Sequence, residues 1–250
     1  MSKKKTNKEK EPKEISVDGF ISKVKEYLAI KDNKKHSNHR YLSWEHCYAI
    51  FNTSSLKTSS DILALHLAFY LASWGMYRGS SFLLQRDYKI HIPVIEILKK
   101  YSQEFRSLPF EQLYSCELID NLYNELNSYL SELKQSVYVT HTNKSNNIIS
   151  DTLITKIIMG TIGCVPAYDR YFKEGINIYG HSLNIDKKAY SKESINQLVK
   201  FYLANKDKFE ELRQGLKVDN ISELIYPPMK IIDMGFWQLG YELDLKNETN

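Results

Sequence analysis

One stretch, residues 150–172, constrains the fold more than any other part of the chain. Its first half repeats apolar side chains at helical spacing, which predicts a helix with one apolar face. Gly163 and Pro166 then end that helix, because glycine weakens a helix interior and proline lacks an amide proton. The helical pattern restarts at Ala167. Asp169 is therefore expected in the first turn of a second helix, where unpaired amide protons favour a carboxylate.

The rest of the chain shows the same helical spacing. We find no alternating β-branched runs long enough for a sheet, no internal repeat and no glycine-rich phosphate loop. The further helices are expected near 17–28, 42–51, 62–74, 92–101, 116–137, 195–203, 206–214 and 229–243. The helix at 62–74 is apolar nearly all round, which predicts the central buried helix. The sequence thus predicts a compact all-α fold of about ten helices.

Length and charge limit the organisation. With 250 residues the chain can bury a full core, and we expect one domain at 15–250, formed by two helical lobes with a cleft between them. Residues 1–14 are rich in lysine and poor in apolar side chains, so they are expected to be a disordered tail. The net charge of +4 permits a polyanionic partner without requiring one.

Cysteine usage and hydropathy indicate a compartment. The chain has three widely spaced cysteines, which imply no disulfide framework. The longest apolar run, 62–77, contains His66 and is too short to span a bilayer, and no signal peptide is apparent. We therefore expect a cytoplasmic protein without a membrane partner. His36, His39 and His46 lack supporting cysteine or carboxylate spacing, so a solvated loop is favoured and neither metal nor cofactor is expected.

The end of the 62–74 helix is unusual. Residues 73–81 combine two glycines with large aromatic side chains and Arg78. Glycine permits a close approach of the backbone to a partner, and an arginine suits phosphate groups or base edges. Alternatively, the segment is a simple helix stop packed by Trp74, with Arg78 in solvent.

The order of these features resembles the helix-hairpin-helix DNA glycosylase superfamily. In that family an apolar helix and a glycine or proline turn precede a catalytic aspartate that caps a helix, and a late helix carries a Phe-Trp-x-x-Gly type pattern. The matching segments here are 154–158, 165–169 and 233–240, and the resemblance covers roughly 59–243. It implies a glycosylase-like helical fold and cleavage of an N-glycosidic bond in DNA.

Two positions depart from the family pattern. The family's hairpin carries glycines, whereas residues 143–147 contain none, so Ser145 or the helix start at Ser150 would have to hold phosphate instead. The region of the family's lysine nucleophile is occupied by Ser150 and Asp151, and Lys156 comes later. The resemblance therefore implies a monofunctional glycosylase that removes a base without a Schiff-base lyase step.

The same resemblance assigns roles to individual residues. Asp169 would stabilise the positive charge that develops on the sugar. A damaged or modified base would be flipped out of duplex DNA and stacked in a pocket formed by Trp74, Tyr77 and Tyr168. The expected DNA contacts are Arg78, Lys144, Ser145, Ser150, Lys156 and Arg170. Such an enzyme could serve DNA repair or antiviral defence against foreign DNA.

Other interpretations stay open at this point. Asp169 could be an ordinary helix cap or a partner of Arg170 or Lys173. The chain could then be a non-catalytic all-α module that binds DNA or another protein. A metal-dependent hydrolase built on the scattered histidines is a third alternative.

Overall fold

The computed structural model describes residues 11–32, 38–53, 58–79, 81–114, 117–138, 148–218 and 223–248. These residues form a compact all-α fold with eleven α-helices and two short 3-10 helices. The helices are α1 (Val17–Lys31), α2 (Leu42–Thr53), α3 (Ser60–Ser73), η2 (Tyr88–His91), α4 (Ile92–Ser107), α5 (Phe110–Leu113), α6 (Leu118–Tyr138), α7 (Asp151–Thr161), α8 (Arg170–Tyr179), η3 (Gly180–Leu183), α9 (Lys192–Ala204), α10 (Lys206–Gln214) and α11 (Pro228–Glu248).

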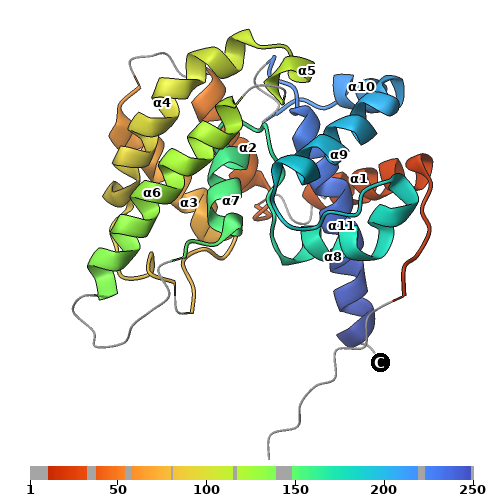
Figure 1. Ribbon diagram of the computed structural model, residues 1–250, viewed down its shortest axis with the longest axis horizontal. Helices are drawn as coiled ribbons and strands as arrows, with labels where there is room; N and C mark the ends of the chain where they lie inside the picture. The colour runs from red at the N-terminus through yellow and green to blue at the C-terminus, as the bar shows by residue number, and fades with distance from the viewer. Residues whose placement is uncertain are drawn as a thin grey trace, which may run out of the picture.

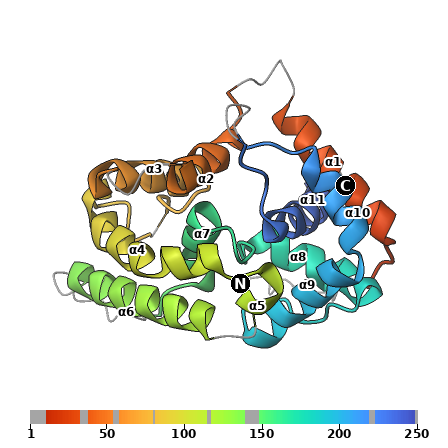
Figure 2. The same cartoon turned by 90° about the horizontal axis from the view of Figure 1, so that it is seen from above.

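The helices lie in two groups, which Figures 1 and 2 show side by side. One group contains α2, α3, α4 and α6, with α7 packed against α2, α3 and α6. The other contains α1, α8, α9 and α10, all in contact with α11 or with a helix that contacts it. The segment between α7 and α8 joins the two groups, and it carries Asp169.

Helix α11 is the centre of the second group. Its residues from Met229 to Gly240 are all buried, and α1 and α8 pack along it. The crossing with α8 is close because both helices carry a glycine there. A Cβ atom on Gly175 would lie 2.1 Å from the Phe236 carbonyl oxygen, and one on Gly240 would lie 2.0 Å from that of Tyr171. Neither position has room for a side chain, so α8 starts at a fixed place on α11.

The prediction that 62–74 is the central buried helix was wrong. Helix α3 buries one side, but Ile62, Leu65 and Phe69 are 48%, 52% and 61% exposed. Their spacing of three and four residues places them on one face of the helix. The most buried helices are instead α7 and α11. An apolar composition shows that a helix tolerates burial on every face. Whether other helices pack on every face depends on the whole fold.

Elsewhere the helix starts follow the sequence signals closely, whereas α4 and α11 end six and five residues later than predicted. The prediction of 206–214 is confirmed by α10, and the predicted break at Gly163 and Pro166 is confirmed by the end of α7 at Thr161. The short helix α5 and both 3-10 helices were not predicted, since four residues carry little periodicity. Predicted disorder does not extend to Lys13, whose N–H donates to the Ile178 carbonyl at 2.7 Å. In the described part of the chain, no helix combines the length and hydropathy needed to cross a membrane.

Candidate functional site around Asp169

The turn that leads to Asp169 depends on a glycine. Helix α7 ends at Thr161, and Gly163 follows with φ of 76°, in the left-handed region. A Cβ atom at this position would also lie 2.5 Å from Cγ of Pro227. The tyrosine hydroxyl of Tyr114 then donates to the Cys164 carbonyl at 2.7 Å. These contacts turn the chain sharply away from α7 and toward α11.

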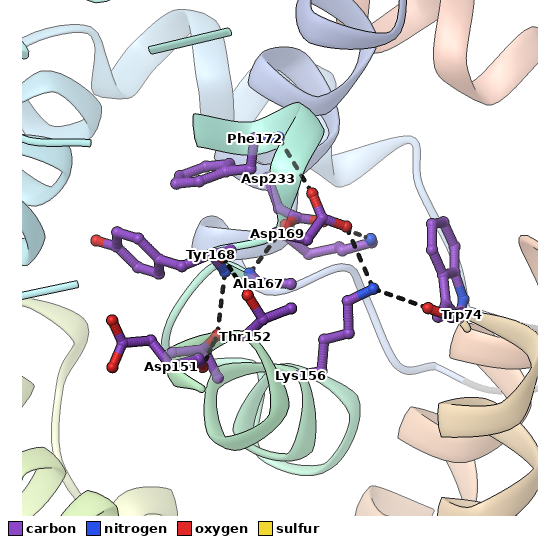
Figure 3. A network of polar contacts seen from close by, with 11 residues as sticks. Trp74, Asp151, Thr152, Lys156, Ala167, Tyr168, Asp169, Phe172 and Asp233 are labelled. Atoms are coloured by element: carbon purple, nitrogen blue, oxygen red, sulfur yellow. Dashed lines mark hydrogen bonds and ion pairs between the residues drawn. The ribbon is translucent and has the colours of Figure 1, made fainter. Parts of the chain in front are cut away.

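Side chains from α7 and α11 fix the backbone immediately before Asp169. The Ala167 N–H donates to Oδ1 of Asp233 at 3.0 Å, and the Tyr168 N–H donates to Oγ1 of Thr155 at 3.0 Å. The Thr152 hydroxyl donates to the Tyr168 carbonyl at 2.7 Å (Figure 3). Three side chains on two helices therefore hold two consecutive residues, so the position of Asp169 is set by the interior.

Asp169 is the N-cap residue of α8. Its backbone is extended, and its Oδ1 accepts from the Phe172 N–H at 3.1 Å, which satisfies one of the free amide protons at the helix start. Its Oδ2 lies 3.2 Å from Nζ of Lys156. The side chain is 12% exposed. The predicted placement at a helix start is confirmed, and the cation that pairs with it is Lys156 rather than Arg170 or Lys173.

Lys156 connects three parts of the molecule. It extends from α7, and its ammonium lies 3.2 Å from the Asp169 carboxylate and donates to the Trp74 carbonyl at 3.1 Å. The same ammonium lies 5.4 Å from the centre of a Trp74 ring. Only 4% of the side chain is exposed, and Figure 3 shows it turned toward Asp169. The sequence interpretation of Lys156 as a DNA contact does not match this buried position.

A second buried pair lies beside the first. Nζ of Lys230 lies 2.7 Å from Oδ2 of Asp233, and both side chains are almost fully buried. The Lys230 ammonium lies within 6 Å of three ring centres, those of Tyr27, Trp44 and Trp74. Burial raises the pKa of Asp233, and the negative charge of Asp169 raises it further, against the lowering effect of Lys230. Two lysines and two aspartates therefore share this part of the interior.

Aromatic rings form one wall of this polar cluster. The rings of Tyr27, Tyr41 and Trp74 stack in sequence, with centroids 4.4 Å and 5.5 Å apart, and the edge of Trp237 contacts all three. The exposed Arg40 guanidinium lies 5.3 Å from the Trp74 ring. Sequence reasoning missed Tyr27, Tyr41, Arg40 and Lys230. Their only signal was an aromatic or basic side chain at ordinary helical or loop spacing.

The three predicted pocket residues are not gathered in one place. Trp74 is partly exposed and lies beside Lys156. Tyr77 donates or accepts a hydrogen bond of 2.6 Å with Nε2 of His91. Tyr168 is fully buried, and its hydroxyl lies 2.7 Å from Oγ of Ser194. Of the three rings, only that of Trp74 lies against the buried cations, Lys156 and Lys230, so the prediction of a shared stacking pocket does not fit Tyr77 or Tyr168.

The predicted DNA contacts have mixed positions. Arg78 is exposed and folds back over Gly75, where an added Cβ would lie 2.9 Å from its Nε. Ser150 is exposed and is the N-cap residue of α7 without a capping side-chain bond. Arg170 is exposed and pairs with Asp244 at 2.6 Å. Lys144 and Ser145 lie outside the described residues.

The histidines that sequence analysis considered as metal ligands are only partly within the described residues. His36 lies outside the described residues, and the ring of His39 meets the Tyr41 ring edge-on at 4.2 Å. Among the described residues, no three histidine, cysteine or carboxylate side chains gather as metal ligands would.

No family model matches the sequence, and neither a curated protein nor a solved structure matches the chain.

Proposed function

We propose that the protein is a DNA N-glycosylase-like enzyme in which Asp169 stabilises the transition state for removal of a damaged or modified base. The observation that carries the proposal is the fixed carboxylate at the start of α8. Thr152, Thr155 and Asp233 hold the backbone of the two residues before it, and 12% of its side chain is exposed. The resemblance to helix-hairpin-helix glycosylases places the catalytic aspartate at this kind of position.

Cleavage of the N-glycosidic bond requires one negatively charged group in a fixed position. As the bond between C1′ and the base nitrogen breaks, positive charge develops on the sugar, and a carboxylate that is already in place stabilises it without reorganisation. A water oxygen then bonds to C1′ and loses a proton, while the base leaves with the electron pair of the broken bond and takes up a proton. Asp169 is suited to this role because its backbone is fixed before substrate arrives.

Lys156 sets a condition on this mechanism. In the structure its ammonium neutralises Asp169, so the two groups must separate, or share the site with the sugar, before the carboxylate can act at full charge. As an ammonium, this nitrogen has no lone pair for attack on C1′, and its hydrogens are directed at the Asp169 carboxylate and the Trp74 carbonyl. We therefore propose water as the nucleophile, consistent with a monofunctional enzyme that forms no Schiff base.

The test measures alkali-labile sites in duplex DNA that carries alkylated or bulky modified bases. We expect the wild-type chain to form them and Asp169→Asn to form them at least about a hundredfold more slowly. Asp244→Asn is the matched control, because it removes an aspartate next to α8 that pairs with a cation on the surface. Circular dichroism and thermal melting establish that both variants are folded. An undiminished rate for folded Asp169→Asn would exclude the proposed role.

Borohydride trapping tests the nucleophile separately. Wild-type protein that excises a base should give no covalent complex with DNA on reduction. A trapped complex that disappears in Lys156→Gln would identify the lysine as the nucleophile and contradict the water mechanism.

The burial of the Lys156–Asp169 pair also favours a second candidate, a non-catalytic all-α module that binds DNA or another protein. A neutralised and nearly buried pair is what a structural cross-link between α7 and α8 requires. Measuring DNA affinity at several salt concentrations distinguishes a DNA-binding module from a protein-binding one. Affinity that falls steeply with salt and without base removal indicates a DNA-binding module, and absence of binding at low salt leaves a protein-binding one.

A further inference from the structure

A cavity in the first helical group is separate from the Asp169 cluster. It has a volume of about 340 Å³ and lies between α2, α3, α4 and the C-terminal end of α7. Its walls are mostly apolar, and Phe51, Leu63, Ile95, Leu98, Phe105 and Ile162 contribute to them. A cavity of this size and lining is in the range that holds small organic ligands.

Both cationic side chains of this cavity lie on one helix. Lys99, Ser102 and Arg106 line it from α4, and their spacing of three and four residues places them on one face. Lys99 shares its charge with Glu96, at 3.4 Å, and also bonds Ser60. Arg106 donates one hydrogen bond, to the Phe51 carbonyl at 3.0 Å, and has no carboxylate partner within the part of the chain that the structure describes. The cavity therefore combines an apolar body with a solvent-exposed guanidinium that has no ion-pair partner among the described residues.

The opposite side of the cavity is held rigidly. The side-chain nitrogen of Asn52 donates to the Tyr48 carbonyl at 2.8 Å and to the Thr161 carbonyl at 2.9 Å. The bond to Thr161 fastens the end of α7 to α2, and the Arg106 bond to Phe51 fastens α4 to the same helix. Because the walls are cross-linked in this way, the space between them is a preformed part of the fold.

We propose that this cavity binds a small amphipathic anion, with its carboxylate or similar acidic group on Arg106 and its apolar part between α2, α4 and α7. Charge-assisted hydrogen bonds from a guanidinium to a carboxylate are among the stronger polar contacts in proteins, and the apolar lining favours an aliphatic or aromatic body. A cationic or purely apolar molecule of the same size lacks a partner for the guanidinium. The proposal does not depend on the chemistry at Asp169.

The test uses sodium decanoate below its micelle-forming concentration, titrated calorimetrically into the full chain. Decylammonium and decanol are the matched probes with the same chain and a different head group. We expect one decanoate to bind per protein and to raise its melting temperature. Decylammonium and decanol should bind at least about tenfold more weakly. Equal binding of all three probes, or no binding of decanoate, would overturn the proposal.

Variants locate the bound probe. Ser102→Phe places a ring in the cavity from a partly exposed helix position, and we expect it to abolish decanoate binding. Gln103→Phe adds the same ring one residue along α4, at an exposed position that does not line the cavity, and should leave binding unchanged. Arg106→Gln should weaken decanoate at least about tenfold, and Arg106→Lys should weaken it less. Unchanged affinity in folded Ser102→Phe would place the probe elsewhere and refute the assignment.

Discussion

Asp169 and Arg170 are neighbours in sequence, yet their ion pairs belong to different environments. The Lys156–Asp169 pair joins α8 to α7 with side chains 4% and 12% exposed. The Arg170–Asp244 pair joins α8 to α11 with side chains 69% and 31% exposed. The surface pair has the shorter separation, 2.6 Å against 3.2 Å. Water screens it, however, so distance alone does not rank the two contributions.

Two further ion pairs have the same spacing along a helix and differ mainly in burial. Lys230–Asp233 and Glu96–Lys99 both join residues three apart on one helix. The first is almost fully buried among aromatic rings, and the second is about half exposed. Removing one partner of a buried pair strands a charge in the interior, whereas water solvates the survivor of a surface pair. Each prediction below tests whether burial, rather than spacing or distance, sets the cost.

The largest effect is expected for Asp233→Ala. This change removes the partner of the Lys230 ammonium and the acceptor for the Ala167 N–H. We expect a loss of about 3–5 kcal/mol in the free energy of unfolding, measured by urea denaturation. Glu96→Ala is the control at the same helix spacing and should cost less than about 1 kcal/mol. Similar losses for the two variants would show that burial does not distinguish the pairs.

Lys156→Met is expected to cost somewhat less, about 3 kcal/mol. It leaves the Asp169 carboxylate without its cation, but the carboxylate keeps its bond from the Phe172 N–H and its small exposure to water. A double-mutant cycle with Asp169→Asn measures the coupling directly. The double variant should lose clearly less than the sum of the two single losses, because the two side chains interact. Strict additivity would mean that the pair contributes nothing as a pair.

Local sequence signals predicted part of this arrangement well. Capping chemistry and the glycine–proline turn were sufficient to place Asp169 at a helix start, because both act over a few residues. The cation beside it could not be placed. Lys156 is thirteen residues away in sequence, and its second acceptor is the backbone carbonyl of Trp74, which has no sequence signature. Spacing along α7 gave no indication of which residues would face the second group of helices.

The wrong assignment of α3 has a related cause. Its composition is more apolar than that of α11, yet α11 is the more buried helix. Glycines at 175 and 240 permit α8 to pack directly on α11, which surrounds α11 with neighbours. The number of neighbours is a property of the packed molecule, so neither the central helix nor the aromatic wall around Lys230 could be predicted from helical spacing.

A buried neutral group should make stability depend on pH. Burial lowers the pKa of His91 to about 4, and its Nε2 is bonded to Tyr77. In the unfolded chain the imidazole keeps its ordinary pKa of about 6.5, so it binds a proton more tightly there than in the folded protein. The free energy of unfolding is therefore highest above pH 6.5 and decreases as the pH falls toward 4. We expect a loss of about 2 kcal/mol between pH 7 and pH 5 by denaturant titration.

His91→Gln should remove this pH dependence, since glutamine does not titrate. His181→Gln is the control, because His181 is exposed at the start of η3 and its replacement should leave the dependence unchanged. An unchanged slope in folded His91→Gln would mean that another group is responsible and that the buried imidazole is not stabilised in its neutral form.

The smallest effect is expected at the surface pair. Arg170→Gln removes the cation that lies 2.6 Å from Asp244, but that carboxylate also accepts a hydrogen bond from the Tyr171 hydroxyl and is reached by water. We expect a loss below about 1 kcal/mol, which falls further in high salt because screening weakens exposed pairs. The loss from Lys156→Met should respond much less to salt, since ions do not reach an interior pair. If Arg170→Gln proved as costly as Lys156→Met, the start of α8 would be held equally from both sides, and the interior would no longer be the main determinant of where Asp169 lies.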